Sequence, residues 1–201
     1  MIILTSNGLS SGALIQEAQK HIPGGGKAAI ITTASWDYKE QDWHIPRLTH
    51  ELQSLGLSVS FFDFDSQEAD ILLNYDVVEI LGGNPFHLLK HLQLVQNKTI
   101  ITNIAENNVL IGISAGTIVL QKNINLVAQF NPELNAEVGL ADLSGLALTD
   151  LDILPHYQRF LSSHDDLETL VRHYELQNDC QITRLNDGQG IFLDHGRSYL
   201  V

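Results

Sequence analysis

Short apolar runs alternate with amphipathic stretches as far as Leu120, and this alternation is the clearest pattern in the chain. Several of the apolar runs are hydrophobic on both faces, as is typical of parallel strands that helices cover on each side. We predict strands over residues 1–5, 28–33, 58–64, 77–81 and 109–113, and helices over 11–21, 42–55, 67–73, 85–95 and 98–106. Strands that alternate with helices predict an α/β fold with a doubly wound, mostly parallel sheet.

The pattern becomes less regular after Leu120. Residues 124–157 carry short strand-like pieces punctuated by Asn and Gly, and they give no strong helical signal. One helix is predicted over about 163–176, followed by short strands with a turn at 194–197. No repeat, linker or low-complexity tract interrupts the chain, so we expect a single domain over residues 1–201.

Composition and charge remove several classes of function. The 201 residues carry a formal net charge of −13, which argues against a nucleic-acid partner because phosphate binding needs clustered Lys and Arg. The only cysteine is Cys180, so an intramolecular disulfide and a cysteine-based metal site are both excluded. No apolar run approaches the roughly 20 residues that span a bilayer, so no membrane partner is expected. The first residues, MIILTSNGLSSG, predict a strand and not a signal peptide, and we expect a cytoplasmic protein.

A serine lies between two glycines where the strand 109–113 meets an apolar helix start. The sequence Gly112-Ile-Ser114-Ala-Gly116 has the strand–turn–helix context of a nucleophile elbow, in which a sharp turn raises the serine hydroxyl above the sheet edge. The alternative is a tight turn with a serine cap, and the pattern alone does not separate the two. Ser114 is therefore the candidate nucleophile.

The candidate base is His156, one of nine histidines. It follows the strand-like run LDILP, and side chains that follow strand carboxyl ends meet at one edge of an α/β sheet. The alternative is a histidine packed under a loop. His87 and His91 stand one helical turn apart and resemble a metal pair, but the sequence shows no third ligand, so we expect a solvated helix face and no metal site there.

A catalytic histidine needs an orienting carboxylate, and an oxyanion needs two N–H donors. Asp187, in the segment RLNDGQGIF, is the candidate acid. A local Asx turn is its alternative role, and Asp150 and Asp152 are rivals closer to His156 in sequence. Ala115 supplies one candidate amide. The glycine pair Gly82-Gly83, after the strand 77–81, offers the second or serves only as a turn.

Four segments in order resemble peptidase family S51, which contains α-aspartyl dipeptidase (peptidase E) and, more distantly, cyanophycinase. They are LGGNPFHLLK at 81–90, IGISAG at 111–116, ILPHY at 153–157 and NDGQGI at 186–191. The resemblance implies a flavodoxin-like, three-layer α/β sandwich akin to class I glutamine amidotransferase domains. It also implies a catalytic order of Ser, His and acid, which differs from the order in α/β-hydrolases.

The resemblance implies Ser114 as nucleophile, His156 as base, Asp187 as acid, and the amides of Gly83 and Ala115 as the oxyanion hole. The dipeptidase branch has Glu where this chain has Asp187. That branch also recognises an aspartyl side chain with an Arg, whereas residues 162–173 here place acids in the corresponding region. Aspartyl specificity is therefore not carried over. The candidate substrate contacts are Gly82, Asn84 and Arg159.

The sequence thus predicts a serine-type peptidase that hydrolyses a small, dipeptide-like substrate without a metal or organic cofactor. We expect a monomer or a small homo-oligomer. The alternatives are another amidase or esterase that uses the same triad, and a non-catalytic α/β domain that binds a ligand.

Overall fold

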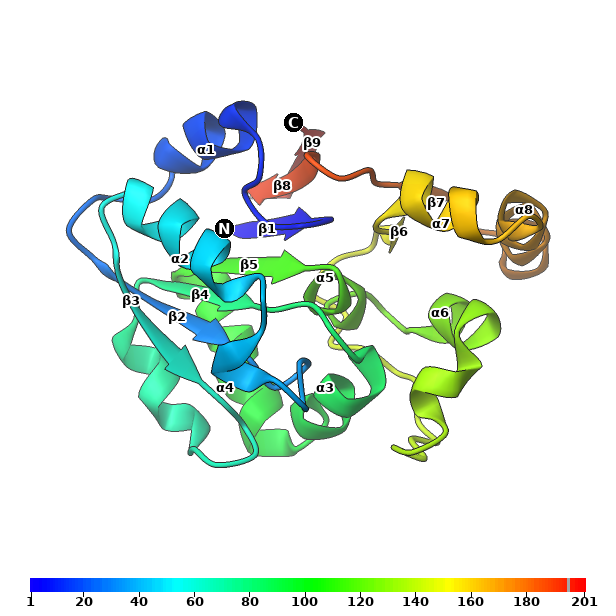
Figure 1. The fold of residues 1–201 in the computed structure, drawn as a ribbon, viewed down its shortest axis with the longest axis horizontal. Coiled ribbons are helices and arrows are strands. Elements are labelled where there is room, and N and C mark those ends of the chain that lie inside the picture. Colours follow the sequence, from blue (N-terminus) through cyan, green and yellow to red (C-terminus); the bar gives the residue numbers. More distant parts are fainter. Residues whose placement is uncertain (195) are drawn as a thin grey trace.

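A seven-stranded sheet forms the centre of the protein (Figure 1). The computed structural model describes residues 1–194 and 196–201. The sheet order is β3-β2-β4-β5-β1-β8-β9, in which the first five strands are parallel and β8 and β9 are antiparallel additions next to β1. The strands are β1 (Ile2–Thr5), β2 (Lys27–Ile31), β3 (Ser58–Phe62), β4 (Val77–Ile80), β5 (Val109–Ile113), β8 (Gly190–Asp194) and β9 (Arg197–Leu200). This order confirms the predicted α/β fold with a mostly parallel sheet.

Helices cover both faces of the sheet, and each face has its own hydrophobic core. Successive residues of a buried strand point to opposite faces, so Ile30 packs into one core and Ile31 into the other. One core includes residues of α1 (Gly12–Gln19) and α2 (Ile45–Ser54). The other includes residues of α3 (Pro85–Leu92), α4 (Val95–Asn107) and the short α5 (Ala115–Val119). The fully apolar strands are therefore explained by burial on both sides.

A smaller unit follows α5 and contains elements that the sequence pattern did not predict. It comprises α6 (Asn125–Phe130), β6 (Asp152–Leu154), α7 (Tyr157–Ser163), α8 (Leu167–Asn178) and β7 (Ile182–Arg184). Strands β6 and β7 form a separate parallel pair. A third hydrophobic cluster joins Leu126, Leu154, Leu167, Val171, Tyr174 and Ile182. In Figure 1 these elements lie beyond the end of the sheet toward which β1 and β5 point.

Several predicted elements differ in detail from the structure. The helix expected over 163–176 is α8, whereas α6 and α7 were not predicted. Helix α7 spans only 7 residues and buries none of them fully, so its apolar periodicity is too short to predict a helix. The helix expected over 67–73 is a 3-10 helix, Ala69–Asn74, and two further 3-10 helices span Lys39–Gln41 and Pro132–Asn135. The turn predicted at 194–197 includes His195, which lies outside the described residues. Within the described chain, no helix has the length and apolar character needed to cross a bilayer.

The strand register brings distant segments to one edge of the sheet. Thr5 pairs with Ile113, so the residues after β1 and β5 emerge side by side. Ile80 pairs with Gly112, which places the loop after β4 next to them. Thr5 also pairs with Gly190, so the segment before β8 returns to the same edge from the opposite direction. Four loops from distant parts of the chain therefore meet here, as expected for a ligand site in an open α/β sheet.

Candidate active site

Ser114 occupies a strained turn between β5 and α5. Its backbone has φ 50° and ψ −107°, a region that residues with side chains seldom adopt. The Ser114 N–H donates to the carbonyl of Thr5 at 3.1 Å, and the Thr117 hydroxyl accepts from the Thr5 N–H at 3.1 Å. These bonds between β1 and the start of α5 hold the turn in place. Strain of this kind is common at functional sites, where the surrounding structure fixes it.

The two glycines beside Ser114 allow close backbone crossings. A Cβ at Gly112 would lie 2.9 Å from the backbone nitrogen of Thr117, and one at Gly116 would lie 2.4 Å from the carbonyl oxygen of Ile80. Such contacts are far shorter than van der Waals distance. The Gly-x-Ser-x-Gly pattern is therefore required by the turn itself, which returns the chain over its own strand and against β4.

His156 lies at the beginning of α7 and contacts Asp187. Its Nδ1 is 2.6 Å from the Asp187 carboxylate, and its backbone is left-handed with φ 55°. Ser6, the residue after β1, completes this cluster. The Ser6 hydroxyl donates to Asp187 at 2.6 Å, accepts from the His156 backbone N–H at 2.8 Å and lies 3.2 Å from His156 Nδ1. Ser6 thus ties the acid and the histidine to the first strand.

The surroundings of His156 favour a neutral imidazole, mainly through burial. Burial lowers its pKa, and this effect outweighs the opposing attraction of Asp187; Arg159 and His44 lower the pKa further. For Asp187, burial acts to raise the pKa, but the Ser6 hydroxyl and His156 together hold it below its usual value. The pair therefore stands at neutral pH as an ionised carboxylate next to a neutral imidazole, which is the resting state of a general base.

The glycine loop after β4 lies directly beside Ser114. A Cβ at Gly82 would lie 3.1 Å from the Cβ of Ser114, and Gly83 has φ 136° with its Cα facing the Ala34 carbonyl. The Ala115 N–H begins α5, where helical N–H groups lack intrahelical partners. Among the described residues, neither the Gly83 nor the Ala115 amide donates a hydrogen bond outside an element. Two amides near the serine are thus available to a ligand.

Asn84, a predicted substrate contact, has its side chain engaged by the protein. Its carboxamide oxygen accepts from the backbone N–H groups of Phe86 and His87 at 2.9 and 3.1 Å and so caps α3. Its amide nitrogen donates to the Leu134 carbonyl at 2.7 Å. Asn84 therefore fixes the glycine loop to the start of α3 and to residues 132–135.

A cavity of about 970 Å³ lies over these residues. Ser114, His156, Gly82 and Gly83 line it, and Arg159 reaches it from α7. Its wall also contains four large aromatic residues: Trp36, Tyr38, Trp43 and Phe160. In the described chain, Ser114 and His156 are not hydrogen-bonded to each other. The contacts of His156 with Asp187 and Ser6 use Nδ1, so Nε2 is left to accept a proton. Catalytic hydrogen bonds of this type often form only with a substrate bound.

The structure separates Asp187 from its two rivals. Asp150 is exposed and pairs with Lys122 at 2.9 Å, and Asp152 is part of β6, so neither contacts His156. Ser6 is the residue of this site that the sequence analysis missed. Its position directly after the first strand could have indicated it, since side chains there reach the same sheet edge as those after β5.

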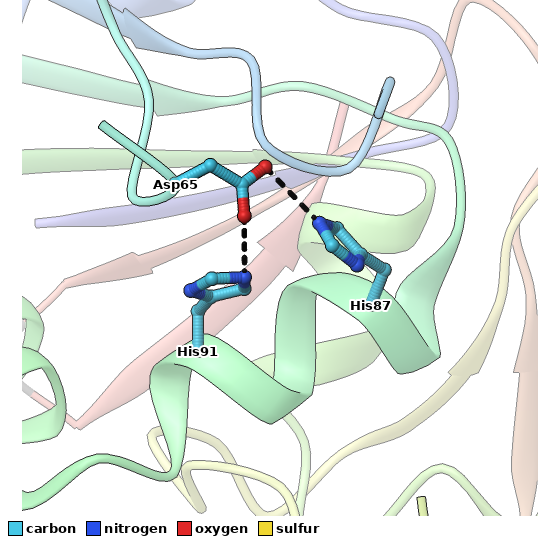
Figure 2. A group of neighbouring side chains, drawn as sticks. All are labelled: Asp65, His87 and His91. Carbon is cyan, nitrogen blue, oxygen red and sulfur yellow. Dashed lines mark hydrogen bonds and ion pairs between the residues drawn. The ribbon is translucent and has the colours of Figure 1, made fainter. Parts of the chain in front are cut away.

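A second cluster of histidine and aspartate lies outside the cavity lining, with two histidines on α3 and an aspartate from the loop after β3. The sequence predicted a solvated helix face at His87 and His91 because no third ligand was evident. That prediction was wrong, because Asp65 supplies a third potential ligand: its carboxylate lies 3.3 Å from His87 Nε2 and 2.9 Å from His91 Nε2 (Figure 2). Both rings are largely buried, and burial lowers the pKa of His91.

Comparison with known proteins gives a consistent family assignment. The sequence model of peptidase family S51 matches residues 2–201. A protein of Listeria monocytogenes described as an uncharacterized peptidase is 30% identical over 197 residues, which are 96% of this chain and 93% of that protein. A crystal structure of a candidate peptidase E protein from Listeria monocytogenes superimposes with a TM-score of 0.81 at 24% identity, covering 100% of this chain and 96% of that one. The crystal structure of a peptidase from an acI-B1 actinobacterium superimposes with a TM-score of 0.74 at 16% identity, covering 100% of this chain and 86% of that one.

The fold and the family match together define a hydrolase of the peptidase class. The chain belongs to peptidase family S51. The structural likenesses support the same flavodoxin-like α/β fold that the four sequence segments implied.

Proposed function

We propose that this protein is a serine peptidase that hydrolyses small peptides with a Ser114–His156–Asp187 triad. The observation that carries the proposal is the 2.6 Å hydrogen bond between His156 and Asp187, because His156 lines the same cavity as the strained Ser114 turn. A nucleophile, a base and an orienting acid on one sheet edge form the arrangement that acyl transfer requires.

Each residue has a defined role in the proposed reaction. Ser114 Oγ attacks the peptide carbonyl carbon while His156 Nε2 takes its proton, and Asp187 stabilises the imidazolium at Nδ1. The Gly83 and Ala115 amides donate to the oxyanion. The intermediate collapses to an acyl-serine as His156 returns the proton to the departing amine. Water then attacks the acyl-serine by the same route and releases the carboxylic acid.

Arg159 is the proposed contact for a negatively charged group of the substrate. Two arginines line the cavity, and Arg47 is committed to an ion pair with Glu51. Within the described residues Arg159 forms no ion pair, and its exposed side chain lies three residues after His156. A free guanidinium next to the base suits the terminal carboxylate of a short peptide. The preferred substrates are therefore short peptides with a free carboxyl group.

The test is a substrate panel with Ser114→Ala. We expect hydrolysis of some unmodified dipeptides and tripeptides, and a loss of turnover on the order of 10⁶-fold in the variant. A serine-reactive phosphonate should label the native protein once per chain and leave Ser114→Ala unlabelled, as mass spectrometry of the intact protein will show. Circular dichroism should give the same unfolding temperature for both proteins.

Two results would contradict the proposal. Substantial peptide turnover by Ser114→Ala would exclude Ser114 as nucleophile. Hydrolysis of small esters or non-peptide amides, with no hydrolysis of any peptide, would keep the triad and replace the substrate class.

A further inference from the structure

The cluster of Asp65, His87 and His91 presents three ligand atoms toward one point. His87 and His91 are four residues apart on α3, so their side chains project from the same helix face. Asp65 comes from the loop after β3 and lies opposite them. Figure 2 shows the carboxylate between the two rings, with one oxygen directed at each Nε2. All three ligand atoms lie within 4.8 Å of one another.

The spacing of these atoms suits a transition-metal ion. Zinc binds imidazole nitrogen and carboxylate oxygen at about 2.0–2.2 Å in tetrahedral sites, which separates neighbouring ligand atoms by about 3.4 Å. His91 Nε2 lies 2.9 Å from one Asp65 oxygen, and His87 Nε2 lies 3.3 Å from the other. Both distances are close to this value, so small side-chain rotations would admit an ion. We propose that Asp65, His87 and His91 form a binding site for a divalent transition-metal ion, with Zn²⁺ preferred and water as the fourth ligand.

The surrounding packing holds the ligands in position before any ion arrives. The His87 ring lies 5.0 Å from the ring of Trp36, and the His91 ring is stacked with Phe64 at 6.4 Å. The side-chain exposures of His87 and His91 are 16% and 20%, whereas that of Asp65 is 35%. One side of the cluster is therefore fixed against aromatic rings, and the other remains open to a water molecule and to the entering ion. Such restraint lowers the entropy cost of binding.

Lys39 is the group that an ion must displace. Its ammonium contacts Asp65 and also donates to Asp63 at 3.0 Å. Metal binding at Asp65 would leave Lys39 on Asp63, which already accepts from the Thr33 hydroxyl at 2.8 Å. The ammonium thus keeps a carboxylate partner after displacement. Lys39 alone would not require two imidazole nitrogens facing the same carboxylate, and metal ligation accounts for both.

Bound metal would join two separate segments of the fold. Asp65 belongs to the loop after β3, and the two histidines belong to α3, whose first turn is capped by Asn84. No step of the proposed hydrolysis passes through this ion, so the site is independent of the proposed function. Its expected effect is stabilisation of the folded protein by ligand binding.

Direct metal titration tests the site. After treatment with EDTA and its removal, isothermal titration with ZnCl₂ should show one equivalent bound, and Co²⁺ should give the visible absorption bands of a tetrahedral nitrogen and oxygen site. We expect His87→Ala, His91→Ala and Asp65→Asn each to weaken Zn²⁺ binding by at least about 100-fold, since loss of outer-sphere partners alone costs 10–100-fold. In the Trp43→Phe background, Zn²⁺ should change the fluorescence of Trp36, the remaining tryptophan.

Matched histidine variants separate this site from others. His173→Ala removes an exposed histidine of α8 and should leave Zn²⁺ affinity unchanged, and so should His156→Ala and His44→Ala. Circular dichroism of each metal-free variant establishes folding, and His91→Gln replaces His91→Ala if the latter does not fold. Absence of stoichiometric Zn²⁺ or Co²⁺ binding would overturn the proposal. So would binding that persists in His91→Ala and disappears in His44→Ala or His156→Ala.

Discussion

Two clusters of histidine and aspartate lie at the same end of this sheet, and they differ in how the carboxylate is shared. Asp187 contacts one imidazole, through Nδ1, and leaves Nε2 free above the cavity that contains Ser114. Asp65 lies between two imidazoles and engages Nε2 of both. The first arrangement leaves a basic nitrogen available for a proton. The second directs every ligand atom inward, which suits a bound cation.

The further side chain that contacts each carboxylate also differs between the two clusters. The Asp187 cluster also contains Ser6, whose hydroxyl donates to the carboxylate. The Asp65 cluster contains Lys39, whose ammonium contacts the carboxylate. A hydroxyl fixes a carboxylate without neutralising it, so Asp187 retains its charge for the imidazolium that forms in the proposed reaction. An ammonium is a competing cation, and a metal ion can take its place. Residue types alone would not have separated the two clusters.

The same substitution in each cluster gives the largest expected contrast. Asp187→Asn should lower kcat by about 10⁴-fold, because an amide favours the wrong imidazole tautomer, while Zn²⁺ affinity stays unchanged. Asp65→Asn should weaken Zn²⁺ binding instead. Peptide hydrolysis and isothermal titration on both variants measure the two effects. A loss of metal binding in Asp187→Asn would show that the clusters are not independent.

Ser6→Ala sharpens the comparison by removing the neutral partner of Asp187. We expect kcat/KM to fall by about 10–100-fold, the equivalent of one hydrogen bond to a charged group. The Ser6 hydroxyl lowers the pKa of Asp187, so that pKa should rise in the variant and the acidic limb of the pH–rate profile should move to higher pH. A fall in unfolding temperature with an unmoved pH profile would assign Ser6 a structural role only.

Arg159→Gln tests the cation beside the proposed base, His156. For peptides with a free carboxyl terminus we expect KM to rise by about 10-fold, and for amidated peptides we expect little change. Arg159 lowers the pKa of His156, so its removal raises that pKa, and kcat/KM should then begin to fall at a higher pH as the solution is acidified. Arg172→Gln is the matched control, because Arg172 is exposed on α8 and pairs with Glu168. An equal rise in KM for amidated peptides would show that Arg159 does not recognise the substrate carboxylate.

Glu79 differs from Asp187 and Asp65 because its carboxyl group has no hydrogen-bond partner among the described residues. We expect its substitution to change the stability of the fold and not the activity. Glu79 is fully buried on β4 with both oxygens unpartnered among the described residues, and burial raises its pKa well above the usual value. Its folded-state pKa exceeds its unfolded-state pKa, so stability is fully present below the unfolded value and declines as pH rises toward the folded one. The limiting slope is about 1.4 kcal/mol per pH unit.

Denaturant unfolding of Glu79→Gln checks this linkage. The variant should lose less free energy of unfolding than the native protein between about pH 5 and pH 8, roughly the range in which proteins are most stable. Parallel curves for the two proteins across that range would show that Glu79 does not titrate on unfolding.

The sequence was most informative where burial is greatest. Most of the parallel strands are buried and rich in apolar residues, and the Gly-x-Ser-x-Gly turn is required by backbone crossings, so both were readable from the chain. Helix α7 was missed because it is short and none of its residues is fully buried. Asp65 was missed because it lies 22 residues before His87, and only the packing of the β3 loop against α3 brings them together. Ser6 and Asp187 meet for a similar reason, across 181 residues of chain.

The pairing of β1 with β8 has a consequence for the timing of activity. Ser6 follows the first strand, and Asp187 precedes β8, which docks antiparallel against that strand. A chain emerging from the ribosome would present Ser114 and His156 long before Asp187 is available. Under the proposed mechanism, nascent chains would therefore remain inert toward peptides until the last strands dock, so that no half-formed chain cleaves its neighbours.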